Sequence, residues 1–251
     1  MKPIDCHDLY SNGRRYDLKT DFKDDIPFYL HQIDKYGDPV LELMCGTGRL
    51  TIPIAEKGVN VVGVDASEQM LNHAKSKASE KGLDIQWVLG DVRDFKLEKL
   101  FNMIFIPINS ITHLHDWESL EACFRCVKEH LTPAGCFIID VFSPSLKMLM
   151  RDSNNRYPVA RYEDPDSGDK VIVTENNVYD DASQINHIKW YHQIGDCEEQ
   201  VVENNMRILF PQELDALLHY NGFVIEHKFG NYDQSPFDSA SPKQLVVCRA
   251  T

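Results

Sequence analysis

The sequence predicts a doubly wound α/β fold, with a mostly parallel seven-stranded sheet and a small antiparallel β-sheet inserted into it. Three observations support this prediction. Apolar runs of strand length alternate with helical patterns as far as residue 142. The first of these runs ends in a glycine turn that opens a helix. Residues 171–173, 185–194 and 201–210 instead form β-rich runs separated by turn residues, without a helical period.

Length and composition limit the classes of protein that fit. A chain of 251 residues with 43% hydrophobic content can bury one large α/β core plus an insertion. Its apolar runs are shorter than the ~20 residues of a membrane span, and its first residues lack the apolar segment of a signal peptide. A net charge of −13 disfavours a nucleic-acid partner, because such binding depends on Lys and Arg. Seven scattered cysteines are typical of reduced thiols, so we expect a cytoplasmic protein.

The stretch 40–49 organises the rest of the chain. A strand over 39–44 runs into Gly46 and Gly48, which allow the backbone to approach a ligand, and the next helix begins with unpaired N–H groups. A second strand, over 60–64, ends in Asp65. A carboxylate at the tip of a neighbouring parallel strand can bind both hydroxyls of a ribose. The two tips therefore predict a site for a nucleoside-containing cofactor.

A dinucleotide site would require a third glycine, and Thr51 stands at that position. The stretch instead resembles motif I of the class I S-adenosylmethionine-dependent methyltransferases, where an acidic residue, a Cys-Gly-Thr-Gly loop and a helix follow one another. Met44 departs from that pattern, in which glycine is usual, and narrows the space beside the methionine part of the cofactor. The resemblance implies a Rossmann-like core, S-adenosyl-L-methionine as cofactor, and contacts from Glu42, Met44, Cys45, Gly46, Thr47 and Gly48.

The resemblance implies further donor contacts along the chain. The first segment, residues 1–21, is expected to cover the cofactor, with a tyrosine hydroxyl on the donor carboxylate; Tyr16 is preferred and Tyr10 is the other candidate. A helix over 24–36 separates this segment from the first strand. After the second and third strands (60–64 and 85–89), the expected contacts come from Asp65, Ala66, Met70, Gly90, Asp91 and Val92. Met70 could equally be an ordinary core methionine of the helix over 67–81.

The fourth strand, over 103–108, places its tip where the reacting methyl group should lie. Ligands of open α/β sheets bind at the carboxyl ends of strands near the point where the strand order switches. Asn109 is therefore expected to contact the cofactor, and His113 to accept a proton from the acceptor or orient it, with a pKa of about 6.5. His192, inside the inserted sheet, is the rival candidate for the same catalytic role.

The second half of the chain completes the fold. A helix over 117–131 precedes the fifth strand, 136–142. Cys123 and Cys126 form a C-x-x-C pair, but they lie in the helical pattern without a second ligand pair, so we predict no metal site. Residues 146–210 are predicted to be an inserted antiparallel β subdomain that acts as a substrate lid. The methyltransferase core then comprises 22–145 and 211–251, with a helix over 211–221 and strands over 223–229 and 244–249.

The order of elements resembles small-molecule N-methyltransferases, notably those that act on nucleotide-linked amino sugars. It implies methyl transfer to a small molecule, with an amine as the expected acceptor, without a nucleic-acid or membrane partner. Two alternatives stay open: an RNA or protein methyltransferase, and a non-catalytic nucleoside-binding regulator. A homodimer is an open alternative to a monomer. An Asn/Asp-Pro-Pro-Tyr motif, which marks methylation of nucleic-acid base amines, is absent.

Overall fold

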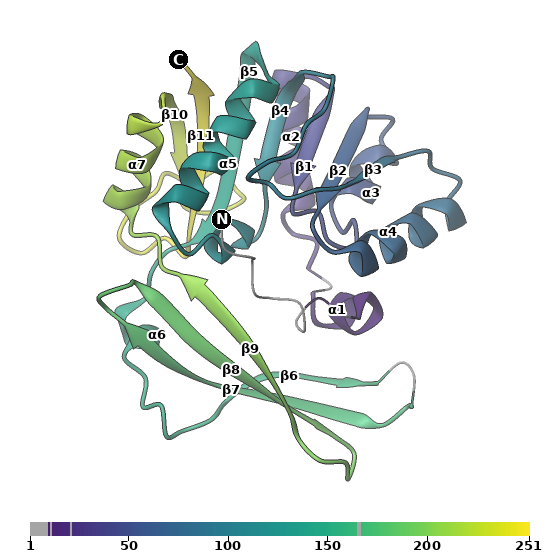
Figure 1. Cartoon of the computed structure of the whole chain (residues 1–251), viewed down its shortest axis with the longest axis vertical. Helices are drawn as coiled ribbons and strands as arrows, with labels where there is room; N and C mark the ends of the chain where they lie inside the picture. The colour runs from purple at the N-terminus through teal and green to yellow at the C-terminus, as the bar shows by residue number, and fades with distance from the viewer. Residues whose placement is uncertain (1–9, 11, 21, 165–166) are drawn as a thin grey trace.

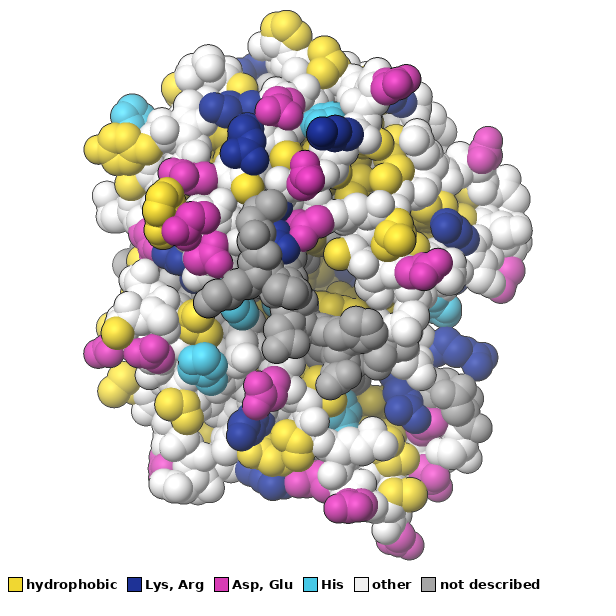
Figure 2. All heavy atoms as spheres, viewed as in Figure 1, with side chains coloured by type: hydrophobic (Ala, Val, Ile, Leu, Met, Phe, Trp, Pro, Cys, Tyr) yellow, Lys and Arg dark blue, Asp and Glu magenta, His cyan; other side chains and the backbone are white. Residues whose placement is uncertain are grey.

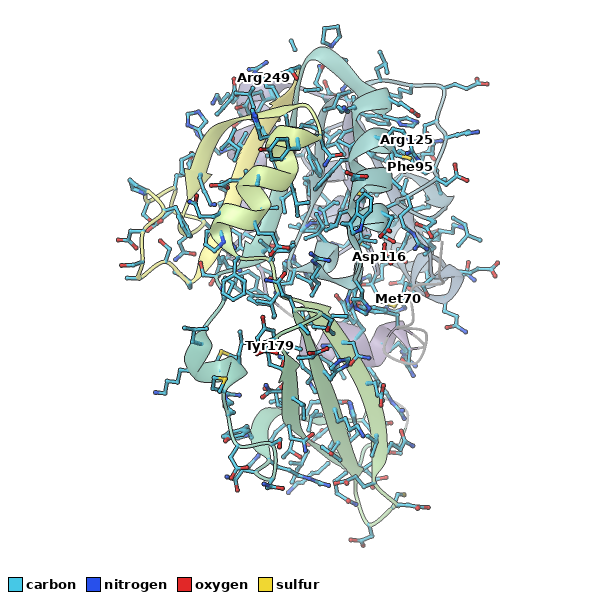
Figure 3. The ribbon with its side chains drawn as sticks, turned by 60° about the vertical axis from the view of Figure 1, so that its left-hand side comes forward. Met70, Phe95, Asp116, Arg125, Tyr179 and Arg249 are labelled. Atoms are coloured by element: carbon cyan, nitrogen blue, oxygen red, sulfur yellow. The ribbon has the colours of Figure 1, made fainter. Side chains whose placement is uncertain are left out.

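The computed structural model describes residues 10, 12–20, 22–164 and 167–251. An α/β core lies above a separate four-stranded sheet, and the short helix α1 (Gly13–Lys19) lies between them (Figure 1). Figure 3, turned about the vertical axis, also shows the second sheet as a distinct layer. Among the described residues, no helix combines the length and apolar character that crossing a bilayer requires.

The core is built on a seven-stranded sheet, called sheet A below. Five neighbouring strands are parallel, and β11 runs antiparallel between β5 and β10. The predicted mostly parallel sheet is therefore confirmed, and its strand order switches between β1 and β4. In order across the sheet the strands are β10 (Phe223–Phe229), β11 (Lys243–Ala250), β5 (Leu131–Phe142), β4 (Phe101–Ile106), β1 (Val40–Leu43), β2 (Val61–Asp65) and β3 (Gln86–Leu89).

Helices cover both faces of sheet A, which explains why its central strands read as continuous apolar runs. Along β4, Ile104 and Ile106 pack into the cluster with α5 (Trp117–His130) and α7 (Pro211–Tyr220), whereas Met103 and Phe105 pack on the other face. That second face is covered by α2 (Ile26–Tyr36) and α3 (Thr51–Ala55), and α4 (Glu68–Glu80) packs on β2 and β3.

The C-x-x-C pair belongs to the core. Cys123 and Cys126 are buried on α5. His130 donates from Nδ1 to the Cys126 carbonyl (2.7 Å) and accepts at Nε2 from the Leu97 N–H (3.0 Å). Both ring nitrogens of this histidine are thus used by the backbone, which gives the motif a packing role.

The inserted sheet, called sheet B below, is antiparallel throughout, as predicted. Its strands are β6 (Tyr157–Glu163), β7 (Lys170–Asp180), β8 (Ile185–Ile194) and β9 (Gln200–Arg207), in that order. The strand β6 was not predicted, because Pro158 made this edge strand resemble a loop. β7 is longer than the predicted 171–173, since the polar residues after Val173 pair with β8, and β9 ends at Arg207 instead of 210.

Sheet B contacts the core at both of its edges. On the β9 edge, the Asn205 carbonyl pairs with His115 Nε2 (2.9 Å), and Arg207 donates to the His115 carbonyl (2.9 Å). His115 follows the short 3₁₀ helix η1 (Ser110–His113), which extends from the tip of β4. On the other edge, β6 packs against α1. A short helix, α6 (Leu146–Leu149), connects β5 to this sheet.

Candidate functional site

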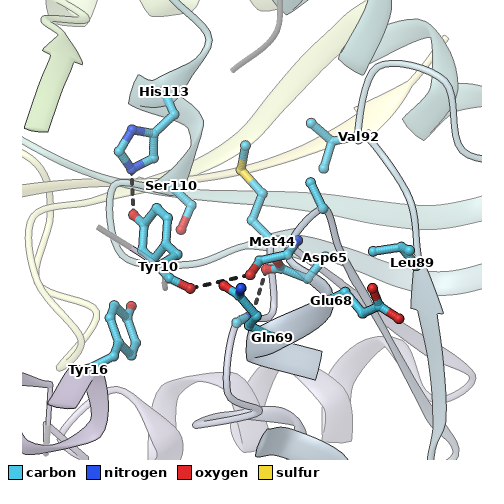
Figure 4. A pocket seen from close by; sticks show the side chains of 13 residues that line it. Tyr10, Tyr16, Met44, Asp65, Glu68, Gln69, Leu89, Val92, Ser110 and His113 are labelled. Carbon is cyan, nitrogen blue, oxygen red and sulfur yellow. Dashed lines mark hydrogen bonds between the residues drawn. The ribbon is translucent and has the colours of Figure 1, made fainter. Parts of the chain in front are cut away.

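A cavity of about 400 Å³ lies at the carboxyl ends of β1 and β2, beside η1 at the tip of β4 (Figure 4). It is therefore located at the switch point of the strand order, where open α/β sheets bind ligands. Its size falls in the usual range for small-molecule sites. Several residues predicted from the sequence line it: Tyr16, Met44, Gly46, Asp65, Ala66, Val92 and His113.

Asp65, at the end of β2, is hydrogen-bonded to the loop that follows β1. Its carboxylate accepts the Gly46 N–H (2.7 Å) and the Ser67 N–H (2.8 Å). Burial raises the pKa of Asp65, and these backbone donors counteract part of that rise. Gly46 has a φ of +55°, and a Cβ there would meet just the Met70 methyl group, at 3.5 Å. The glycine therefore provides a left-handed turn with its backbone open to the cavity.

Other residues in and around the glycine loop do not line the cavity but stabilise the loop by packing and hydrogen bonds. Gly48 has a φ of +73°, and a Cβ there would lie 2.6 Å from the Trp87 ring, so this glycine serves packing. Glu42 accepts a hydrogen bond from the Thr51 hydroxyl, and burial raises its pKa to about 8, so the carboxyl is protonated at neutral pH. Cys45 and Thr47 are likewise buried beneath the loop.

The helix α1 covers one side of the cavity, although the sequence analysis assigned no helix to this polar segment. Asp17 anchors it by accepting hydrogen bonds from the Thr47 hydroxyl (2.5 Å) and Lys77 Nζ (2.6 Å) and by pairing with His73 Nε2 (3.0 Å). One residue earlier, Tyr16 lines the cavity, and burial raises its pKa to about 12. The Tyr16 phenol is therefore a neutral hydrogen-bond donor at physiological pH.

His113 faces the cavity together with Tyr10. The Tyr10 hydroxyl and His113 Nε2 are 2.7 Å apart, and the two rings meet edge to face with centroids 5.6 Å apart (Figure 4). His113 is 8% exposed, and this burial lowers its pKa to about 4. The expected value near 6.5 is thus wrong for this environment, because the charged imidazolium would lose its hydration. His113 is neutral at physiological pH.

The tip of β4 has an unusual backbone that presents this histidine. Ile108 and Asn109 adopt positive φ values of 37° and 60°. The Asp140 carboxylate accepts the Ile108 N–H (3.2 Å) and the Tyr232 hydroxyl (2.6 Å), and Asn109 Oδ1 accepts the Phe142 N–H (2.7 Å). The Asn109 side chain therefore stabilises the turn and is absent from the cavity lining.

The remaining predicted donor contacts are adjacent to the cavity wall but are not among the residues that line it. Met70 is 1% exposed and packs beneath the Gly46 turn. Gly90 and Asp91 follow β3, and the Asp91 carboxylate binds Arg93 through Nε (2.9 Å) and Nη2 (2.6 Å). Burial opposes ionisation of Asp91, but these charged hydrogen bonds lower its pKa overall. His192 is buried on β8 of sheet B, so the two candidate histidines do not share the cavity lining.

Some lining residues were not predicted. Ser67, Glu68 and Gln69 come from the beginning of α4, immediately after the Asp65 tip. Leu89, at the end of β3, is 57% exposed and lines the cavity from that strand tip. Ser110 lines the cavity from the first turn of η1. Strand-tip position alone could have identified all of them, because these tips converge on one edge of the sheet.

Comparisons with known proteins agree with this geometry. A family model described as a methyltransferase domain matches residues 40–135. The chain is 33% identical over 217 residues to the cypemycin N-terminal methyltransferase of a Streptomyces species, covering 84% of this chain and 82% of that protein. It is 28% identical over 136 residues to the dTDP-3-amino-3,4,6-trideoxy-alpha-D-glucopyranose N,N-dimethyltransferase of Streptomyces venezuelae, covering 55% of each chain.

Among solved structures, the CcbJ methyltransferase of Streptomyces caelestis superposes with a TM-score of 0.82 at 23% identity. The match covers 96% of this chain and 98% of that one, so the shared fold includes sheet B. The glycine turn, the Asp65 tip and the cavity at the switch point all lie within or beside the part of the chain that matches the family model. The chain belongs to the S-adenosylmethionine-dependent methyltransferases.

Proposed function

We propose that this enzyme transfers the methyl group of S-adenosyl-L-methionine to an amine nitrogen of a small molecule. The observation that carries the proposal is the neutral Tyr10–His113 pair at the β4 tip, facing the cavity beside the Asp65 tip. This pair can hold a polar acceptor group by hydrogen bonds without placing a positive charge next to the sulfonium.

In the proposed donor pose, Asp65 binds the ribose hydroxyls, because its carboxylate has lone pairs beyond those used by Gly46 and Ser67. Val92 and Leu89 offer apolar surface for the adenine ring. The neutral Tyr16 phenol can donate to the donor carboxylate. Glu42, Cys45, Thr47, Gly48 and Asn109 then act by fixing the loops, while contacts from Met70, Gly90 and Asp91 stay predictions.

Transfer requires a nitrogen lone pair in line with the S–CH₃ bond. The N–C bond forms as the C–S bond breaks, its electron pair remains on sulfur, and the product ammonium then loses a proton to solvent. A base with a pKa of about 4 cannot efficiently deprotonate an alkylammonium, whose pKa is near that of lysine at ~10. The acceptor therefore binds as the neutral amine, and His113 and Tyr10 act by orientation and desolvation.

The names of two relatives support a nitrogen acceptor, since one is an N-terminal methyltransferase and the other an amino-sugar N,N-dimethyltransferase. The small cavity and the net charge of −13 favour a small molecule over RNA. The six described cysteines are free thiols, five of them buried, which supports a cytoplasmic location.

The test is a panel of paired acceptors, each offered as an amine and as the corresponding alcohol, with S-adenosylmethionine carrying a labelled methyl group. We expect label in amines alone, with turnover reduced in Tyr10→Phe and His113→Ala. The matched control is His219→Ala, on the exposed face of α7. Equal labelling of the alcohols would overturn the amine assignment. Donor binding without turnover of any acceptor would favour the non-catalytic regulator.

A further inference from the structure

The helix α1 carries two anchors that point to different parts of the molecule. Asp17 connects it to the donor side, through Thr47 of the glycine loop and through His73 and Lys77 of α4. Arg15 connects it to sheet B: its Nε lies 2.7 Å from the Asp164 carboxylate at the end of β6. One short helix thus contacts the cavity loop and the inserted sheet together (Figure 1).

Asp164 connects the Arg15 ion pair to the backbone between β6 and β7. Its side chain is fully buried, whereas the Arg15 side chain is 32% exposed. The same carboxylate accepts the Ser167 N–H (3.0 Å), and the Asp164 carbonyl accepts the Gly168 N–H (2.8 Å), so the residue organises the turn from β6 into β7. A buried carboxylate is costly without cationic or hydrogen-bonded partners. Displacement of α1 would therefore remove a cation from this buried carboxylate.

The Arg15–Asp164 contact matters for the position of sheet B because the opposite edge of that sheet, β9, is attached to the core. β9 continues into α7 and is hydrogen-bonded to the ring and to the carbonyl of His115, two residues after the cavity-lining His113. β6 is the other edge strand of the same sheet, and there α1 is the contacting helix. A sheet fixed along one edge and held through a separate short helix at the other can change position when that helix is ordered.

We propose that Arg15 is a positioning residue that couples donor occupancy to the placement of the β6 edge, so that the donor binds before the acceptor. The inference rests on the proposed donor pose, in which Tyr16 contacts the donor and thereby orders α1. Donor binding then fixes Arg15 against Asp164, and with it the β6 edge of sheet B, the predicted substrate lid. Coupling of this kind between two sites typically changes an affinity by about 5- to 150-fold.

Hydrogen exchange measured by mass spectrometry tests the coupling with S-adenosylhomocysteine, the demethylated product, as the probe. In the wild type we expect saturating product to slow exchange in residues 157–180 by about fivefold. Arg15→Ala should abolish this product-dependent protection and, because coupling is reciprocal, weaken product binding in calorimetry by up to about fivefold without abolishing it. Arg15→Lys, which keeps the charge, should restore part of the protection. The readout is the change on adding product, so a generally looser turn does not imitate it.

The matched control is Arg156→Ala, which breaks the exposed Arg156–Glu199 pair (2.6 Å) of the same sheet. This control should retain the protection. Equal protection in wild type and Arg15→Ala would overturn the coupling, and so would product binding to the wild type without protection of β6 and β7. Absence of product binding to the wild type would instead reject the donor pose itself, so the two failures are distinguishable.

Discussion

At the scale of single residues, the proposed donor pose depends on Asp65. Asp65→Ala should weaken binding of S-adenosylhomocysteine by about 1–3 kcal/mol, because it removes the ribose acceptor and frees the Gly46 and Ser67 N–H groups that it now holds. Calorimetry measures the loss. Asp84→Ala is the control, since Asp84 is exposed and lies before β3, at the opposite end of the strands. Equal affinity for wild type and Asp65→Ala would reject this pose.

His113 should make folding stability depend on pH. Burial lowers its pKa from 6.5 to about 4, so between these values the unfolded chain binds a proton that the native chain does not. Its contribution is complete above pH 6.5 and is lost as the pH falls through about 4, by on the order of 3 kcal/mol. His113→Gln should flatten this window in urea unfolding curves relative to wild type. Parallel curves for the two proteins would contradict the burial of a neutral histidine.

Some features of single residues could be predicted from the sequence and others could not. The Asp65 tip and the glycine turn were predictable because they depend on local spacing. The role of Asn109 was not, because its partner is the Phe142 N–H, 33 positions away. The low pKa of His113 was equally hidden, since its main cause is burial in the folded protein, with a smaller contribution from His115.

At the scale of elements, sheet B should be separable from the core. It has its own small apolar cluster around Val171, Val173 and Ile194, whereas Leu209 packs in the core. Joining Ser145 to Ile208 through a Gly/Ser linker should therefore preserve cooperative unfolding and donor binding, and abolish turnover. Circular dichroism, calorimetry and the acceptor assay measure these three properties. An insoluble or non-cooperative product would show that the core needs sheet B to fold.

The helices and strands differ in how clearly the sequence predicts them. Strands buried on both faces, such as β4, were evident from their apolar runs. The edge strand β6 was missed, since it alternates exposed and half-buried residues and contains Pro158. The helix α1 was also missed. Asn12 caps it and is a local signal, but the helix is short, and its anchoring by Asp17 to α4 and the glycine loop is not visible in any local pattern.

At the scale of the whole molecule, the charge distribution predicts that the protein does not bind nucleic acid. The net charge is −13, and acidic and basic side chains are interspersed on the face drawn in Figure 2. Filter binding with a mixed RNA pool at low salt should show no retention, because binding of this kind requires clustered Lys and Arg. Retention that falls steeply with added salt would instead support a macromolecular acceptor.

One residue of the cavity wall has a consequence for donor engineering. Met44 has a φ of 56°, a backbone that costs a residue with a Cβ about 1–2 kcal/mol, and its side chain lines the cavity. Shortening a wall residue usually enlarges a cavity at the expense of stability. Met44→Gly would enlarge the cavity and relieve backbone strain together, so the two effects offset each other. Met44 is therefore the wall position at which we expect a substitution to admit synthetic sulfonium donors with larger alkyl groups at little cost in stability.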